Sequence, residues 1–244
     1  MAEYDSSDVA FFTVDGYELL GFSSTIKDSG AVQMTADRTP LGASLSRKRL
    51  LGIIEPVTIE QEGWFADDAV GPHTALDAKR GTTQLVTYGP EGNAVGRIFI
   101  GASSPQTRYD PIVAKGDAIR TGARWECSEY ERGLLLATYA ARAAAGNTQA
   151  TSIDNGAASL TGAVAYLVCT SLTLDGAADL VVKVRESADN INFTDLATFT
   201  ALAAVGAQRL VIAGTVKQYL AISWAWGAGG TSPTWTGLVG VART

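Results

Sequence analysis

The stretch DGAADLVVKVRESADNINFTDLATF, residues 175–199, decides the fold class of this chain. Over residues 180–185, Leu180 and the valines at 182 and 184 alternate with residues that include Lys183 and Arg185. This period of two is typical of a β-strand that buries one face. Turn-forming residues stand on either side, at 175–176 and 189–190. The stretch therefore predicts short antiparallel strands joined by tight turns.

The same pattern continues to the end of the chain. In YLAISWAW, residues 219–226, Leu220, Ile222, Trp224 and Trp226 share one face of a predicted strand. The Gly-rich stretch 227–233 supplies a turn before the closing strand TWTGLVGVART. Several short strands at regular spacing predict a β-sandwich for the last hundred residues. We expect Trp224 and Trp226 to pack in its core.

Composition narrows the class of protein. The 244 residues are enough for one or two domains, and 46% of them are hydrophobic, enough for a full core. The net charge of −6 argues against a protein that binds nucleic acid by neutralising phosphates. No basic leader precedes an apolar segment at the start, and no apolar run reaches the ~18 residues of a membrane span. We expect a protein made and folded in a cytoplasm, without a membrane partner.

A change in composition predicts a domain boundary within residues 145–152, which we place between 1–148 and 149–244. The sequence there is small, polar and free of aromatic residues, as in a linker. Residues 1–146 carry 14 Lys/Arg and 19 Asp/Glu, whereas residues 147–244 carry 5 and 6. The second part is thus expected to be a nearly neutral module that folds independently.

The N-terminal part also has strand signals. VAFFTVDGYELLG, residues 9–21, predicts two strands around a turn at Asp15-Gly16, and residues 82–102 predict a hairpin. In residues 57–62, Val57, Ile59 and Gln61 alternate with Thr58, Glu60 and Glu62, which predicts an amphipathic strand. One short helix is expected within 66–80, interrupted at Gly71-Pro72. Leu134–Ala145 is compatible with either helix or strand.

The residue types of catalytic sites are scarce. His73 is the only histidine, it stands in a Gly-Pro-His-Thr loop context, and no Gly-x-Ser-x-Gly motif is present. No spacing of Cys, His or Asp matches a metal site. Cys127 and Cys169 both lie on apolar stretches and are expected to be buried free thiols. We expect no enzyme, no cofactor and no metal, with Trp235 as the one aromatic residue considered for a surface contact.

The polar segment 28–52 is the strongest candidate for a contact with other molecules. It is too long for a plain hairpin loop, and loops of this length in compact domains are usually functional or disordered. It carries the basic cluster Arg47, Lys48 and Arg49 in an otherwise acidic protein. We interpret this cluster as a candidate interface with an acidic face of a neighbouring copy, against the simpler reading of a solvated loop tip.

Several of these stretches together resemble a known family. A strand that ends in EGWFADD, residues 62–68, leads into a short helix, preceded by a long polar segment and followed by hairpins. This resembles the tube domain of major tail proteins of long-tailed bacteriophages, particularly those that infect actinobacteria. Residues 175–189, 193–199 and 208–224 are similar to the carboxy-terminal β-sandwich of the same proteins. The resemblance covers most of the chain and rests on patterns of hydrophobic residues and turns.

The resemblance implies a mainly β fold, with a tail-tube β-barrel or sandwich flanked by one helix and a C-terminal immunoglobulin-like β-sandwich. It implies six copies that close a ring by edge-to-edge sheet pairing, and rings that stack into a tube in the virion tail. The implied partners are other copies of the chain, the tape measure protein, and tail terminator or distal tail proteins. DNA would pass through the lumen without specific binding.

Two further expectations follow. An acidic lumen repels DNA, and Glu60 and Glu62 on the polar face of their strand are the candidate lumen residues. The alternative function is a virion decoration protein or a receptor- or carbohydrate-binding β-sandwich. Imaging of concentrated protein separates the two, because only the tube subunit forms rings or tubes.

Overall fold

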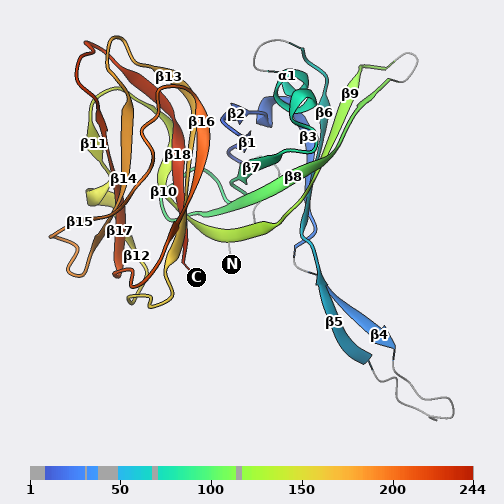
Figure 1. Ribbon diagram of the computed structural model, residues 1–244, viewed down its shortest axis with the longest axis horizontal. Helices are drawn as coiled ribbons and strands as arrows, with labels where there is room; N and C mark the ends of the chain where they lie inside the picture. Colours follow the sequence, from blue (N-terminus) through green and yellow to red (C-terminus); the bar gives the residue numbers. More distant parts are fainter. Residues whose placement is uncertain (1–8, 31, 38–48, 68–70, 114–116, 244) are drawn as a thin grey trace.

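A computed structural model describes residues 9–30, 32–37, 49–67, 71–113 and 117–243, with backbone alone for 32–37 and 49–55. The described chain is mainly β with one short α-helix, which confirms the predicted fold class (Figure 1). Its first ten strands are β1 (Phe12–Val14), β2 (Tyr17–Glu18), β3 (Ser23–Asp28), β4 (Val32–Asp37), β5 (Arg49–Glu55), β6 (Thr58–Trp64), β7 (Thr83–Tyr88), β8 (Ile98–Ile112), β9 (Arg120–Glu126) and β10 (Glu129–Arg142).

The remaining elements follow the predicted turns. The strands are β11 (Gly146–Asn147), β12 (Ile153–Asp154), β13 (Ala163–Thr173), β14 (Leu180–Ser187), β15 (Thr194–Thr198), β16 (Gly206–Ile212), β17 (Tyr219–Trp226) and β18 (Thr234–Arg243). The helix α1 (Pro72–Leu76) begins at the proline, and 3-10 turns form at Leu20–Phe22, Asp77–Lys79 and Gln149–Thr151. None of the described helices is long and apolar enough to cross a bilayer.

One long antiparallel sheet runs through both parts of the chain, in the order β16-β13-β18-β10-β8-β7-β1-β2. The far half of β8 leaves this sheet and continues into β9, β6 and β3. The sheet curls until its two ends meet. Gly16, beside β2, packs so close to Gly206 of β16 that a Cβ added at Gly16 would lie 2.8 Å from the Gly206 backbone. The two lobes in Figure 1 are thus built on a shared sheet.

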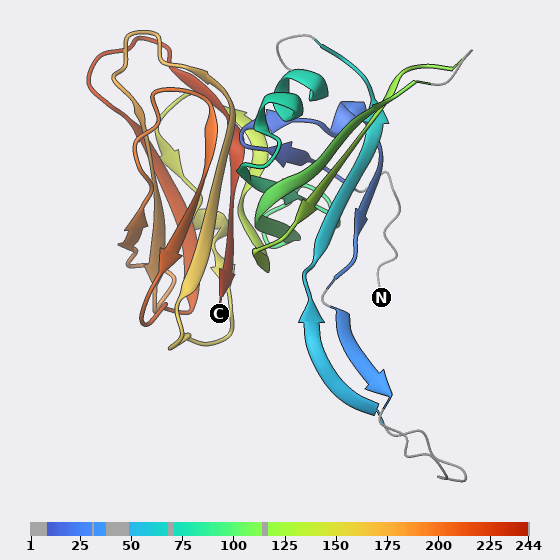
Figure 2. The same cartoon turned by 45° about the vertical axis from the view of Figure 1, so that its right-hand side comes forward.

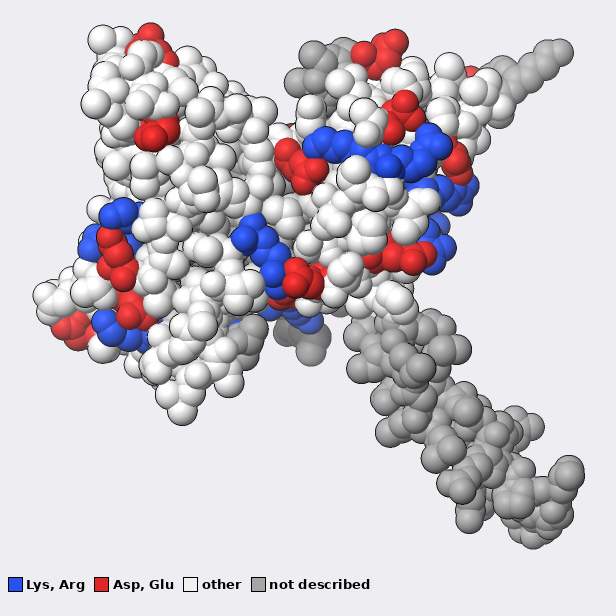
Figure 3. Space-filling view, viewed as in Figure 1, with Lys and Arg blue, Asp and Glu red and all other residues white. Residues whose placement is uncertain are grey.

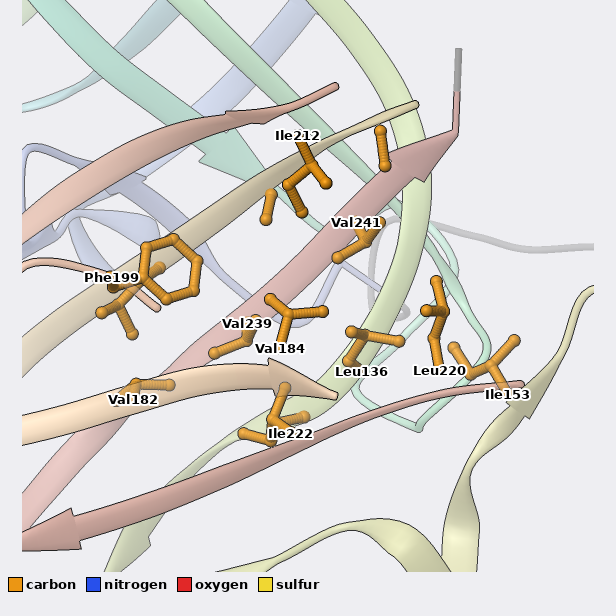
Figure 4. Close-up of a cluster of buried hydrophobic side chains, with 14 of the residues drawn as sticks. Leu136, Ile153, Val182, Val184, Phe199, Ile212, Leu220, Ile222, Val239 and Val241 are labelled. Carbon is orange, nitrogen blue, oxygen red and sulfur yellow. The ribbon is translucent and has the colours of Figure 1, made fainter. Parts of the chain in front are cut away.

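Three hydrophobic clusters fill the part of the molecule that the structure describes. The first lies between β16-β13-β18-β10 and the sheet of β17, β14 and β15, and forms the core of the predicted C-terminal sandwich (Figure 4). The second lies in the N-terminal lobe among β1, β6, β7, β8, β9 and α1. The third fills the inside of the curl and draws on both parts of the chain: Phe11, Phe99, Leu135, Val164, Tyr166, Val168 and Leu238.

Leu134–Ala145, which the sequence left open between helix and strand, is strand through Arg142. Leu135 faces the cluster inside the curl, whereas Leu136 belongs to the sandwich core. A strand buried on both faces reads as a continuous apolar run, as buried parallel strands do. The period of two is therefore absent from the sequence although the strand is regular.

The small polar stretch at the expected boundary is hydrogen-bonded to its surroundings. β11 pairs with β17 at Gly146↔Trp224, and β12 pairs with it at Ile153↔Leu220. Across the same point β10 pairs with β18 from Leu134↔Val241 to Arg142↔Trp235. The division at 148/149 stays a prediction, but the sheet and core shared across it argue against the independent folding expected of the second part.

The structure corrects the expected long loop at 28–52. Residues 32–37 and 49–55 form a two-stranded ribbon, β4–β5, paired from Val32↔Glu55 to Asp37↔Arg49. The ribbon projects away from the lobes in both views (Figures 1 and 2). A signal for it exists in the sequence, since apolar residues alternate over 32–37 and residues 50–54 form an apolar run.

The predicted turns are confirmed. Asp15 and Gly16 both have positive φ, 48° and 89°, as a two-residue hairpin turn requires. Asp15 also accepts hydrogen bonds from the backbone N–H of Leu85 (2.7 Å) and from Lys79 Nζ (2.8 Å), so this turn ties β1 to β7. β7 and β8 form the expected hairpin.

Candidate assembly surfaces

The basic cluster predicted as an interface is described in the structure only at Arg49. Arg47 and Lys48 fall outside the described residues, and Arg49 is the first residue of β5, opposite Asp37. The role of these three residues therefore stays a prediction. What the structure adds is that Arg49 lies on the projecting ribbon β4–β5 (Figure 2).

Glu60 and Glu62 lie on the outer face of β6, as predicted. Ile59 and Gln61 on the opposite face are fully buried. Register places Lys27 of β3 and Arg124 of β9 opposite Glu60. Arg124 also contacts Glu60 at 3.6 Å, and Lys27 contacts Glu62 at 3.8 Å.

These pairs belong to a charged face on the sheet β3-β6-β9-β8. Its members are Lys27, Glu60, Glu62, Arg108, Asp110, Arg124 and Glu126. The Asp110 carboxylate raises the pKa of Arg108 by a hydrogen bond and by its charge. Exposed ion pairs contribute little to stability, so this face matters mainly through the field that it presents.

That field is weaker than the sequence suggests. Four carboxylates on the charged face stand beside three cations. Opposite charges within a Debye length largely cancel when viewed by a distant phosphate. Figure 3 shows the same mixture of blue and red on the visible side of the N-terminal lobe. The lumen assignment of Glu60 and Glu62 remains a prediction, and the sequence did not anticipate their cationic neighbours.

An exposed apolar tip lies at the other end of β6 from the ribbon. Trp64 and Ile112 are each 44% exposed, Ile119 43% and Val113 73%. The Arg120 guanidinium lies 5.3 Å from the centre of the Trp64 ring. The ribbon joins β6 at its start, beyond Thr58, whereas this tip lies at its end, so the two features stand at opposite ends of one sheet (Figure 1).

Several described strands keep an open edge. β3 pairs only with β6, and β15 and β16 each have one pairing strand. Beside β3 runs a groove of about 360 Å³ lined by Val9, Leu20 and Ile26 together with the serines of β3. An unpaired edge offers a row of backbone N–H and C=O groups to another chain.

The interior of the N-terminal lobe holds an unusual number of amides. Gln61, Gln84 and Gln106 are each at most 1% exposed. Gln84 Oε1 accepts a hydrogen bond from Trp125 Nε1 at 2.6 Å, but neither amide atom of Gln106 has a partner. Such orphaned groups lower stability by about 1–3 kcal/mol each.

His73 has a packing role in the structure. It is half-buried in the first turn of α1, and its Nδ1 lies 2.9 Å from the Tyr109 hydroxyl. Its ring packs between Phe65 and Tyr109. Within the described residues no three His, Cys, Asp or Glu side chains gather as metal ligands would.

Both cysteines are free and buried, as predicted. Burial raises the pKa of each thiol, and that of Cys169 reaches about 11.

The interpretation of Trp235 as a surface residue is wrong. Trp235 is 1% exposed and packs edge-on against Trp224. The Arg142 guanidinium lies 4.7 Å from the centre of its ring and donates to the carbonyls of Thr138, Ala140 and Gly237. Burial lowers the pKa of Arg142 to about 10. Trp224 and Trp226 are half-buried against the sandwich core, as expected.

Comparisons with known proteins give distant likenesses. No protein-family model and no curated protein matches the chain. Among solved structures it is similar to the Dit protein of phage SPP1, described as a hub adsorption apparatus, with 10% identity, 96% of this chain and 99% of that chain covered, and a TM-score of 0.37. It is also similar to a chain of the phage p2 baseplate, with 6% identity, coverage of 96% and 98%, and a TM-score of 0.32. Likenesses this weak do not establish a shared fold.

Proposed function

We propose that this protein is a structural subunit of a bacteriophage tail tube, whose copies form stacked, hexameric rings around a channel for genome delivery. The observation that carries the proposal is that the two ends of the sheet containing β6 differ. It has a projecting ribbon at one end and an exposed apolar tip at the other. Two unlike ends on one molecule suit head-to-tail contacts, which build open filaments of stacked copies.

The ribbon supports the proposal because it has no other strand of the described chain beside it. β4 and β5 pair only with each other. An isolated two-stranded ribbon is marginally stable in water, and its edges are templates for pairing. We therefore assign the ribbon to the contact between copies and include Arg47, Lys48 and Arg49 in that contact.

The open edge of β3 supports a second contact, within the ring. A neighbouring copy can extend the sheet there by backbone hydrogen bonds. The apolar groove beside β3 offers places for side chains of the added strand. In this arrangement the sheet that carries Glu60 and Glu62 lines the channel, and DNA passes it without specific binding.

The role is structural and not catalytic, and the further partners are the tape measure protein and the tail terminator or distal tail proteins. The alternative is a virion decoration protein or a receptor- or carbohydrate-binding β-sandwich, and it loses Trp235 as a candidate surface contact because Trp235 is buried. Because β10 and β18 share one sheet, the C-terminal sandwich stays attached to the tube wall and does not swing on a linker.

Electron microscopy of the concentrated full-length protein tests this function. We expect stacked rings or tubes, with six subunits visible in end views. Isolated rings that never stack would support the proposed ring contact and contradict the proposed stacking into a tube. Monodisperse monomers or trimers at every concentration would overturn the proposal and favour the alternative.

A further inference from the structure

The hydrogen-bond ladder between the body and the ribbon is interrupted at the ribbon root, residues 29–30 and 56. The last pair of the β3–β6 ladder is Asp28↔Ile59, and the first pair of the ribbon is Val32↔Glu55. Pro56 has no N–H to donate, and Gly30 adopts a positive φ of 59°. The ribbon is therefore not held in line by a continuous sheet.

Side chains replace backbone bonds at the root. The N–H of Ser29 still donates to the Thr58 carbonyl at 3.0 Å, but the N–H of Thr58 donates to Ser29 Oγ at 2.9 Å. The N–H of Gly30 donates to Asp28 Oδ1 at 2.8 Å. These bonds shape the turn and tie Ser29 to Thr58, the first residue of β6, so they stay within the β3–β6 hairpin.

Asp28 connects the β3 side of the root to strands outside the β3–β6 hairpin. Its Oδ2 accepts hydrogen bonds from the Tyr88 hydroxyl at 2.5 Å and from the Tyr130 hydroxyl at 2.6 Å. Tyr88 is the last residue of β7 and Tyr130 the second residue of β10, so one carboxylate joins three strands. Burial, and then the bond to Asp28, raises the pKa of both tyrosines. Bonds to a charged acceptor are roughly twice as strong as neutral ones.

The surface beside this contact is open. A hollow of about 610 Å³, lined by Asp28, Tyr88, Tyr130 and Arg132 among others, lies next to the root. On the β3 side, the described contacts between the root and strands outside the β3–β6 hairpin are those of the carboxylate with its two hydroxyl donors.

We propose that Asp28, Tyr88 and Tyr130 form a latch that fixes the direction in which the ribbon leaves the body. The six residues of β4 extend about 20 Å at ~3.3 Å each. A rotation of about 15° at the root thus moves the far end by about 5 Å, more than a hydrogen bond tolerates. The use of the latch rests on the proposed function: identical contacts throughout a symmetric assembly need every ribbon in the same direction.

The test measures the ribbon in the monomer. Spin labels on Cys residues introduced at Thr35 and Thr107 report the distance between ribbon and body, and the native thiols are buried. We expect a narrow distance distribution in the parent protein and broad ones in Asp28→Ala and in the Tyr88→Phe/Tyr130→Phe double variant. Asp110→Ala, which removes an exposed carboxylate of the same lobe, is the control and should match the parent.

A distribution in Asp28→Ala as narrow as the parent's, with unchanged circular dichroism, would overturn the latch. If the ribbon loosens and the rate or yield of assembly falls, both the latch and its use in assembly are supported. If the ribbon loosens while Asp28→Ala assembles normally, the latch stands and its role in assembly is contradicted. A parent protein that never assembles would contradict the proposed function, whatever the distance measurement shows.

Discussion

The curled sheet of the body and the β4–β5 ribbon are made of the same kind of strand, but different forces hold them. In the body, β10 is buried on both faces and paired on both edges, by β8 and β18. In the ribbon each strand has one neighbour, and Asp28 ties the β3 side of its root to β7 and β10. Burial dominates protein stability, so the body is expected to fold alone, whereas the ribbon is expected to contribute little to the free energy of unfolding.

Because of this difference, we expect stability and assembly to depend on different residues. Residues of the curl should govern whether the protein folds, and residues of the ribbon should govern whether it assembles. The predictions below test that separation, from the largest expected effect to the smallest.

Truncation after Gly146 should prevent folding. It removes β13 and β18, which cover Leu135 and Phe99 inside the curl. Each such side chain stabilises the fold by about 1.5–3 kcal/mol when buried, and total stability is only about 5–15 kcal/mol. Circular dichroism and amide NMR spectra of the truncated protein should show no native structure. A soluble, folded fragment would show that the N-terminal part is an independent domain.

Leu135→Ala should lower the free energy of unfolding by about 2–5 kcal/mol, because it leaves a cavity in the curl. Urea denaturation of the full-length protein measures the loss. Val211→Ala is the matched control, since Val211 is 63% exposed and should change stability by less than about 0.5 kcal/mol. Similar losses in both variants would mean that the curl is not a core.

Stability should fall as pH rises above about 10, the ordinary pKa of tyrosine. Tyr88, Tyr130 and Tyr166 have raised pKa values in the folded protein, chiefly because they are buried. When a tyrosine has a higher pKa in the folded than in the unfolded protein, its contribution to stability is complete below the pKa of the unfolded state. That contribution is lost as the pH rises toward and through the pKa of the folded state. Tyrosinate absorbance should therefore appear together with unfolding. Ionisation of these tyrosines in a protein that remains folded at pH 11 would contradict the burial.

Gln106→Met should raise the free energy of unfolding by about 1–3 kcal/mol, because it removes two buried amide atoms that have no partners. Gln84→Met serves as the contrast, since Gln84 bonds to Trp125 and its loss leaves the indole N–H unpaired. Thermal denaturation of both variants gives the comparison. Destabilisation by Gln106→Met would indicate that this amide has bonding partners in solution.

The sequence predicted the elements whose causes are local. β6 and β14 bury one face and alternate in sequence, and the Asp-Gly turn at 15–16 needs positive φ, which those residue types supply. β10 was ambiguous because burial on both faces erases the alternation. Trp235 was wrongly predicted to be at the surface, because its position beside a proline-containing loop does not indicate whether its side chain faces the core or the solvent.

Contacts between distant residues were beyond the sequence. The candidate residues Glu60 and Glu62 were found on the expected face, but the cations beside them come from β3 and β9. The bonds of Asp28 reach residues 60 and 102 positions away. Only the fold brings such groups together, so one sequence read alone could not pair them.

Deletion of residues 36–50 tests the central claim most directly, since it shortens the ribbon and leaves the body intact. The account predicts a soluble protein whose unfolding free energy stays within about 0.5 kcal/mol of the parent's and which forms no tubes in electron micrographs under conditions where the parent does. Tubes of normal length from the deleted protein would contradict the account, because assembly would then not depend on the ribbon.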